Sequence, residues 1–193
     1  QDYQEALTWF LKAAEDDWDQ ALYAVGNMYQ EAIGVEQDYE KAMEYYLLAA
    51  QQEYAPAQYG IGRLYEHGHG ESADLEQALS WYRKAAAQDY PDAQHALGIL
   101  YNEGHGVPED LGESFNWFVK SAENDFLPAQ HEVGVCYYYG EGVEQSYEHA
   151  TEWFRKAAEA GHSPSQFALG LLYEQGRGVE EDLNEAIRLY QLA

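Results

Sequence analysis

The chain of 193 residues carries 35 Asp and Glu against 10 Lys and Arg, which gives a formal net charge of −25. This charge argues against a protein that binds nucleic acid or an anionic membrane surface, because no positive field is present to displace counterions from phosphates. The composition of 46% hydrophobic and 15% aromatic residues excludes an acidic disordered tail and predicts a folded chain.

Two further features of the whole chain narrow its class. A single cysteine, Cys136, cannot form an internal disulfide, so the disulfide framework of many small secreted domains is absent. No apolar run approaches the roughly 18 residues of a transmembrane helix. The chain begins at Gln1 rather than Met, and we therefore expect a processed chain or an excised segment.

The sequence repeats itself with a period of 36 residues. In chain order the units span residues 2–37, 38–73, 74–109, 110–145 and 146–181, and a partial unit covers 182–193. Each unit opens with a residue that is a suitable helix N-cap. These residues are Asp2, Asp38, Asp74, Asp110, Ser146 and Asp182. Because a period of this size is typical of a solenoid or an array, we expect one repeat domain over 1–193.

Each unit contains two helical patterns, which are clearest in the third unit. The first follows Asp74, and the second begins near Pro91 and runs to Gly104. Their apolar residues fall at helical spacing, as Ala78, Trp81, Tyr82 and Ala85 and then as Ala93, Leu97, Leu100 and Tyr101. No segment requires a strand. The sequence therefore predicts an all-α fold, a right-handed superhelical solenoid of about five helix pairs followed by a final single helix.

A glycine recurs in the middle of the second helix of every full unit. These glycines are Gly26, Gly62, Gly98, Gly134 and Gly170. A mid-helix glycine costs roughly 1 kcal/mol relative to alanine, so its recurrence needs a compensating contact. We expect close approach, in which the missing Cβ lets a Trp or Tyr of a neighbouring helix lie against the backbone. The recurring Trp, Tyr, Gly and Ala residues are then helix packing rather than a cofactor site.

These residues resemble Sel1-like repeats, relatives of tetratricopeptide repeats with a longer unit. The family pattern A-x-x-x-L-G-x-x-Y-x-x-G-x-G-V is matched by residues 93–107 and recurs at 165–179, and its continuation is matched by 110–122. Three positions depart from it: Ala32 replaces a loop glycine, Glu71 replaces the loop valine, and Leu48 replaces a lysine. The resemblance implies an α-solenoid scaffold that assembles protein complexes.

A search for catalytic or metal-binding groups gives no positive result in the sequence. His67 and His69 flank Gly68 in a loop, and His105 occupies the position of His69 one unit later, too far to share one zinc ion, so we interpret these histidines as loop or surface residues. The motif at His131 lacks the second histidine of a zincin, because Val135 stands in its place. Cys136 occupies an apolar helix position and is expected to be buried. We therefore expect no catalytic residue, no cofactor and no metal.

Recognition is expected at positions that vary between units, because the recurring positions are explained by packing. By resemblance to tetratricopeptide arrays, the second helices line a concave face. The variable stripe on these helices gives the predicted partner-binding residues Tyr59, Arg63, His95, Ile99, Asn102, His131, Val135, Tyr138 and Tyr139. Its remaining members are Tyr23, Asn27, Gln30, Glu31, Glu66, His67, Glu103, Phe167, Leu171, Glu174 and Gln175. The alternative, which is open for the first residue of each set, is that the aromatic members complete the interhelical core.

The leading interpretation is a bacterial, non-enzymatic scaffold that binds a protein or peptide on its concave face. The alternative is an acidic inhibitor or immunity-type protein that neutralises a basic partner enzyme, which would use the net charge of −25. A third class, an enzyme or sugar-binding module, is favoured only by the aromatic residues and histidines. We expect a soluble protein of the bacterial cytoplasm or periplasm, and a partner that presents a basic surface.

Overall fold

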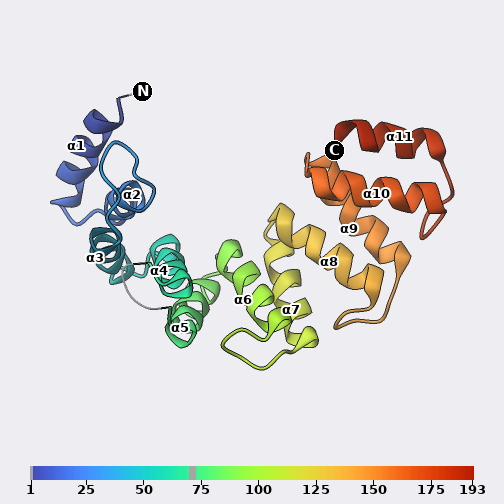
Figure 1. The fold of residues 1–193 in the computed structure, drawn as a ribbon, viewed down its shortest axis with the longest axis horizontal. Coiled ribbons are helices and arrows are strands. Elements are labelled where there is room, and N and C mark those ends of the chain that lie inside the picture. The colour runs from blue at the N-terminus through green and yellow to red at the C-terminus, as the bar shows by residue number, and fades with distance from the viewer. Residues whose placement is uncertain (1, 70–72) are drawn as a thin grey trace. The chain divides into compact units, whose positions relative to one another are not determined.

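The computed structural model describes residues 2–69 and 73–193, so the loop departure expected at Glu71 lies outside the described residues. Within these ranges the chain forms eleven α-helices and no strand, which confirms the all-α solenoid of helix pairs (Figure 1). The helices are α1 (Tyr3–Ala14), α2 (Asp19–Gln30), α3 (Tyr39–Ala50), α4 (Ala55–His67), α5 (Leu75–Ala86), α6 (Pro91–Glu103), α7 (Leu111–Glu123), α8 (Leu127–Tyr139), α9 (Tyr147–Glu159), α10 (Ser163–Gln175) and α11 (Leu183–Leu192).

The first helix of each pair begins at the predicted N-cap. The Oδ1 atom of Asp74, for example, accepts a hydrogen bond of 3.0 Å from the backbone N–H of Gln77. The same contact is made at the start of α1, α3, α7, α9 and α11, where Ser146 uses its hydroxyl oxygen for α9. Each cap satisfies at least one backbone donor that has no intrahelical partner, which fixes where the helix starts.

The second helices end at a position in the left-handed backbone region. Gly68, Gly104, Gly140 and Gly176 have φ between 60° and 77° there. Ala32, which replaces the loop glycine in the first unit, adopts the same conformation with φ of 56°. Because a β-carbon disfavours this conformation, the first repeat unit carries strain at this position, where the other repeat units have glycine.

The mid-helix glycines lie against aromatic rings, as the close-approach interpretation predicts. A β-carbon on Gly62 would stand 2.5 Å from Cε1 of Tyr82, and one on Gly134 would stand 2.6 Å from Cε1 of Phe154. The rings are those of Tyr46, Tyr82, Phe118, Phe154 and Tyr190, so they are Tyr or Phe and none is the tryptophan that the sequence also allowed. The recurring tryptophan, replaced by Tyr45 and Leu189 in two units, stands one position earlier. Four tryptophans, Trp9, Trp81, Trp117 and Trp153, lie instead under a lysine of their own helix.

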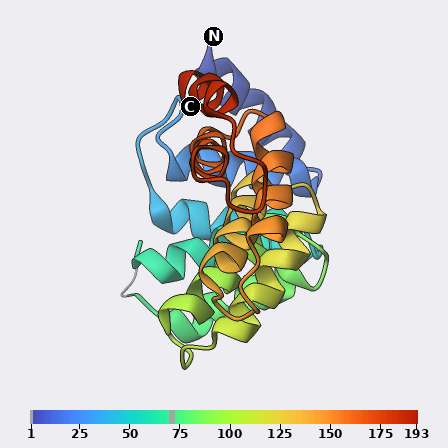
Figure 2. The ribbon, with the colours of Figure 1, turned by 90° about the vertical axis from the view of Figure 1, so that its right-hand side faces the viewer.

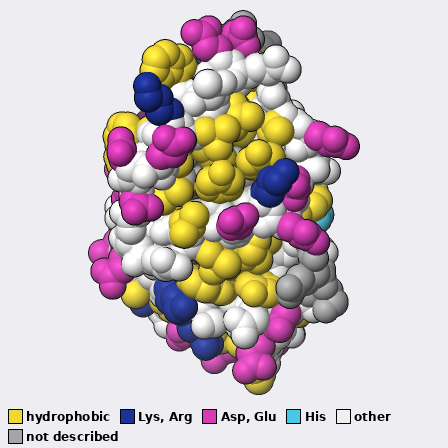
Figure 3. All heavy atoms as spheres, turned by 90° about the vertical axis from the view of Figure 1, so that its left-hand side faces the viewer, with side chains coloured by type: hydrophobic (Ala, Val, Ile, Leu, Met, Phe, Trp, Pro, Cys, Tyr) yellow, Lys and Arg dark blue, Asp and Glu magenta, His cyan; other side chains and the backbone are white. Residues whose placement is uncertain are grey.

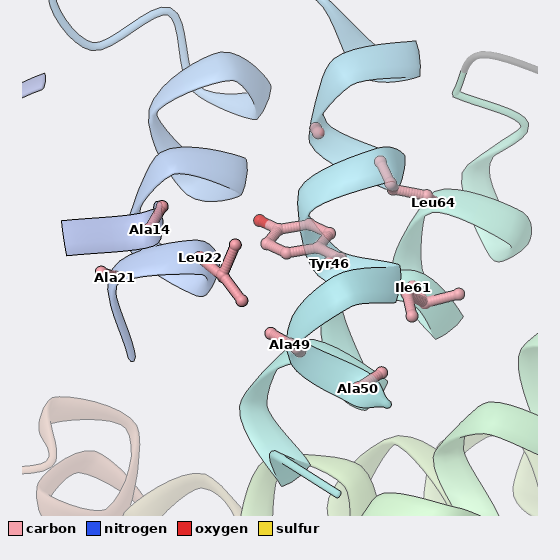
Figure 4. Close-up of a cluster of buried hydrophobic side chains, with 10 residues drawn as sticks. Ala14, Ala21, Leu22, Tyr46, Ala49, Ala50, Ile61 and Leu64 are labelled. Atoms are coloured by element: carbon pink, nitrogen blue, oxygen red, sulfur yellow. The ribbon is translucent and has the colours of Figure 1, made fainter. Parts of the chain in front are cut away.

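The chain divides into two compact units, residues 1–93 and 94–193. In the first, Tyr46 of α3 lies between Leu22 of α2 and Ile61 of α4, and its ring is buried (Figure 4). In the second, Phe118 and Phe154 anchor two buried clusters. At its C-terminal end α10 and α11 lie side by side, with Gly170 against Tyr190 (Figure 2).

The face of the first unit shown in Figure 3 presents a group of apolar side chains at its N-terminal end. A groove of about 390 Å³ lies there between α1 and the end of α2, lined by Tyr3, Phe10, Met28 and Ile33 among others. The side chain of Trp9 on α1 is 62% exposed. None of the described helices is long and apolar enough to cross a membrane.

Candidate functional site

The two predicted stripe residues on α4 have different environments. Tyr59 packs against the rings of Tyr82 and Tyr90 at centroid distances of 5.5 and 5.7 Å, and burial raises its pKa. Its role is therefore interhelical packing, which is the alternative that the sequence left open. Arg63 lines a small polar pocket of about 150 Å³ together with Glu31 and His67.

The stripe on α6 is also divided between packing and surface positions. His95 packs between Phe118 and Phe126, at 5.5 and 5.3 Å between ring centroids. Burial lowers its pKa from 6.5 to about 4, and its Nε2 atom is buried without a hydrogen-bond partner among the described residues. Ile99 packs against the same cluster, whereas Asn102 is exposed.

The four stripe residues of α8 come together in one groove. His131, Val135, Tyr138 and Tyr139 line it from α8. Phe154 of α9 and residues of α10 complete the lining, namely Pro164, Phe167, Ala168 and Leu171. The groove has a volume of about 310 Å³, within the range of about 300 to 1,000 Å³ that is typical of ligand pockets. We refer to it as the α8–α10 groove.

The edge of the α8–α10 groove is formed by two large rings that the fold leaves in solvent. Tyr139 is 64% exposed and Phe167 is 52% exposed. The neighbouring Tyr138 is more enclosed, because its ring contacts Tyr139 and Tyr147 and its hydroxyl oxygen accepts a hydrogen bond of 3.2 Å from Arg177. Tyr138 and Tyr139, although adjacent on α8, therefore have different environments.

His131, which lines the groove, is linked to His162 through hydrogen bonds to Ser165. Nδ1 of His131 and Nδ1 of His162 lie 3.0 and 2.9 Å from the buried hydroxyl of Ser165. One hydroxyl donates a single proton, so one histidine accepts from Ser165 while the other donates to it. Burial lowers the pKa of His131 to about 4, with His162 as a second cause, so this wall is uncharged near pH 7.

A contact that recurs in other repeat units is missing at this pair of helices. The hydroxyl of Tyr46 donates to Oε1 of Gln30 at 3.0 Å, and Tyr190 donates to Oε2 of Glu174 at 2.6 Å, a partner sixteen residues earlier in both cases. Tyr82 makes the same contact with Glu66. In the two remaining units the ring is Phe118 or Phe154, and the residue sixteen positions earlier is Asn102 or Tyr138.

The absent hydroxyl frees two stripe positions from this contact. Asn102 is left in solvent, and Tyr138 turns to Tyr139 and Tyr147 while the ring of Phe154 lines the groove. Phe154, Pro164 and Ala168 lie outside the predicted stripe. Comparison of the ring position with the residue sixteen places earlier is the sequence signal that would have identified Phe154.

The remaining histidines and the cysteine make local contacts in the part of the chain that the structure describes. No cluster of three or more His, Cys, Asp or Glu side chains with metal-binding geometry occurs there. His69 stacks on Tyr39 at 4.3 Å, and Nδ1 of His105 lies 2.9 Å from a carboxylate oxygen of Glu103. Cys136 is 5% exposed, as predicted, and burial raises the pKa of its thiol to about 12.

Comparisons with known proteins agree with this architecture. A family model described as Sel1 repeat matches residues 1–17, 19–54, 55–90, 91–126, 127–162 and 163–193. A search of curated proteins found no match. Among solved structures, the chain is similar to a Sel1 repeat protein from Oxalobacter formigenes, with 32% identity and a TM-score of 0.88 over 98% of this chain and 76% of the other.

Two further solved structures are similar. One is a protective antigen present in uropathogenic Escherichia coli strains and displaying an SLR fold, with 37% identity and a TM-score of 0.89 over 96% of this chain and 40% of the antigen. The other is an immunity protein from Pseudomonas aeruginosa, with 20% identity and a TM-score of 0.67 over 100% of this chain and 74% of the other, a likeness in fold alone. With six matched segments over almost its whole length, this chain belongs to the Sel1 repeat family.

Proposed function

We propose that this chain is a non-enzymatic protein-interaction module that binds a segment of a partner protein in the α8–α10 groove. The observation that carries the proposal is the exposure of two large rings, Tyr139 at 64% and Phe167 at 52%, at the edge of an apolar cavity. Contiguous exposed apolar surface of this kind is typical of interaction sites. Membership of a family of repeat scaffolds supports the same conclusion.

The chemistry of the groove supports binding rather than catalysis. Its lining is mainly aromatic and aliphatic, and the Ser165 hydroxyl that contacts His131 and His162 is fully buried and does not line the groove. Aromatic anchors such as tyrosine carry much of the binding energy in protein interfaces. We place the protein in a bacterial cytoplasm or periplasm, because the similar solved structures are bacterial.

Affinity capture with three matched baits tests the proposal. The wild-type chain, the double variant Tyr139→Ala with Phe167→Ala, and the variant Trp9→Ala are each used to capture proteins from a lysate of the source organism. Trp9→Ala is the control because its ring is equally exposed but lies on α1. We expect a partner that is retained by wild type and Trp9→Ala and lost from the double variant. An identical set of proteins on all three baits would overturn the proposed site.

A second candidate function is inhibition of a basic enzyme in the manner of an immunity protein. The observation in its favour is the net charge of −25, and one solved structure of the same fold is described as an immunity protein. Such a partner would associate with a salt-dependent rate and lose its activity on binding. Loss of the activity of the captured partner separates this function from a scaffold role.

A further inference from the structure

The α8–α10 groove has a chemistry that defines what enters it. Its walls are the rings of Tyr138, Tyr139, Phe154 and Phe167 with aliphatic groups between them, and His131 in the wall is uncharged near pH 7. A charged or strongly polar side chain would lose its hydration in such a cavity without gaining partners. A large apolar side chain would bury its surface there at no such cost.

The electrostatics around the groove select the residues beside that apolar side chain. Tyr139 is the last residue of α8, and Leu171 lies one turn before the end of α10 at Gln175. The C-terminal ends of α-helices carry partial negative charge, which favours cations. Residues 94–193 also contain 17 Asp and Glu against five Lys and Arg. Arg177, a cation close to this end, is engaged by the Tyr138 hydroxyl and the Tyr147 ring.

We propose that the α8–α10 groove takes a bulky apolar side chain from a linear partner segment that carries Lys or Arg next to it. This inference rests on the proposed function and specifies the partner. The apolar residue fills the space over Phe154, and the basic neighbour lies toward the C-terminal ends of α8 and α10.

A substitution of Phe154 tests this proposal. At the equivalent position Tyr46, Tyr82 and Tyr190 place a hydroxyl toward the residue sixteen positions earlier. The substitution Phe154→Tyr is therefore compatible with the repeat, but its hydroxyl would enter the groove, because the Tyr138 side chain contacts Tyr139 and Tyr147 instead. Phe118→Tyr makes the same change one unit earlier, at a ring that does not line the groove, and is the matched control.

The experiment is selection of a random peptide display library on the full chain, followed by binding measurements with fluorescein-labelled synthetic copies of the enriched peptides. We expect enriched sequences that pair a Leu, Phe or Trp with Lys or Arg within two positions. Their Kd should rise at least tenfold on Phe154→Tyr and on Tyr139→Ala, and should be unchanged on Phe118→Tyr. Because the flank is basic, Kd should also rise with added salt.

Several results would overturn the inference. They are an absence of enriched peptides, a consensus without the apolar residue, acidic flanks with affinity that salt does not weaken, or equal binding by wild type and folded Phe154→Tyr. If the enriched peptides need Tyr139 but lack the basic residue, the inferred partner chemistry is wrong and the groove is still a binding site. If captured partners bind the double variant Tyr139→Ala with Phe167→Ala as well as they bind wild type, the proposed function is wrong.

Discussion

Gly98 of α6 lies directly against the ring of Phe118 on α7, and its carbonyl oxygen accepts a hydrogen bond of 2.8 Å from the hydroxyl of Ser114. A β-carbon on Gly98 would overlap Cε1 of the buried Phe118 ring. The contact between the two helices is therefore made by ring against backbone, and it depends on the absence of one methyl group.

The first prediction follows from this contact. Gly98→Leu should lower the free energy of unfolding by about 3 kcal/mol, because the ring of Phe118 has to move out of a packed position. Gly98→Ala should cost less, since only one carbon is added. Urea denaturation followed by circular dichroism measures both values, and a Leu variant as stable as wild type would contradict the close-approach interpretation.

The second prediction concerns the left-handed residue at the end of α2. Ala32→Gly should stabilise the protein by roughly 0.5 to 1 kcal/mol, because glycine adopts a φ of 56° without the steric cost that alanine has. The reciprocal change Gly104→Ala, at the equivalent position with φ of 68°, should destabilise it by a similar amount. Thermal unfolding shows whether the melting temperatures of the two variants shift in opposite directions. A shift in the same direction for both would exclude backbone strain as the cause.

The third prediction separates binding from stability in the α8–α10 groove. Tyr138→Ala together with Tyr139→Ala should weaken partner binding by about 2 kcal/mol or more. Tyr139→Ala alone should leave the melting temperature nearly unchanged, because its ring is 64% exposed. Phe154→Ala, which removes a ring that is 2% exposed, should cost about 3 kcal/mol of stability. Equal losses of stability and binding in the double variant would place both tyrosines in the core.

The fourth prediction is an acid destabilisation caused by His95. Its pKa is about 4 in the folded chain and 6.5 ordinarily, so the unfolded chain binds the proton first as pH falls. The contribution of His95 should therefore lower stability between pH 6.5 and 4, by up to roughly 3 kcal/mol. This contribution should be constant below pH 4.

The variant His95→Phe measures this contribution. It should reduce the loss between pH 6.5 and 4 and leave the part caused by His131, whose pKa is also lowered to about 4. It should also raise stability near pH 7 by about 1 kcal/mol, because the buried Nε2 atom has no hydrogen-bond partner among the described residues. Tyr59→Phe, at the equivalent position one repeat unit before His95, is the control and should follow the wild-type slope. Parallel pH curves for wild type and His95→Phe would show that His95 is protonated equally in both states.

The fifth prediction concerns electrostatic steering of a basic partner. The first 40 residues contain ten Asp and Glu against one lysine, Lys12, and the whole chain has a net charge of −25. The association rate constant should fall about tenfold or more between low and physiological salt, as the Debye length shrinks from about 30 to 8 Å. Stopped-flow fluorescence measures this rate. A rate that does not depend on salt would leave the charge as a solubility feature alone.

The helix pairs could be predicted from sequence because their limits are set locally. Asp74 caps α5 through its own side chain, and Pro91 is the first residue of α6. The roles of the stripe residues were harder to predict, because helical periodicity places Tyr59 and His95 on the same face as Tyr139 without stating how far the neighbouring helix reaches. Tyr59 and His95 are covered by rings of the next pair, whereas Tyr139 at the end of α8 is not.

Two residues at or near the groove make contacts that helical periodicity in the sequence does not reveal. Phe154 has the size and helix position of Tyr46, and its significance lies in a missing hydroxyl whose partner would be sixteen residues away. His162, the N-cap residue of α10, contacts Ser165 three residues later, and only the fold brings His131 to the same hydroxyl. Residues that act through a contact between helix pairs are visible in sequence only when the units are compared column by column.

The burial of Cys136 has a practical consequence for spectroscopy. A thiol that is 5% exposed, with its pKa raised to about 12, has almost no thiolate at neutral pH and reacts slowly with maleimides. A second cysteine placed at an exposed position, such as Gln175→Cys beside the end of α10, can therefore be labelled selectively without replacing the native one. Single-site fluorophores can in this way report directly on events at the rim of the groove.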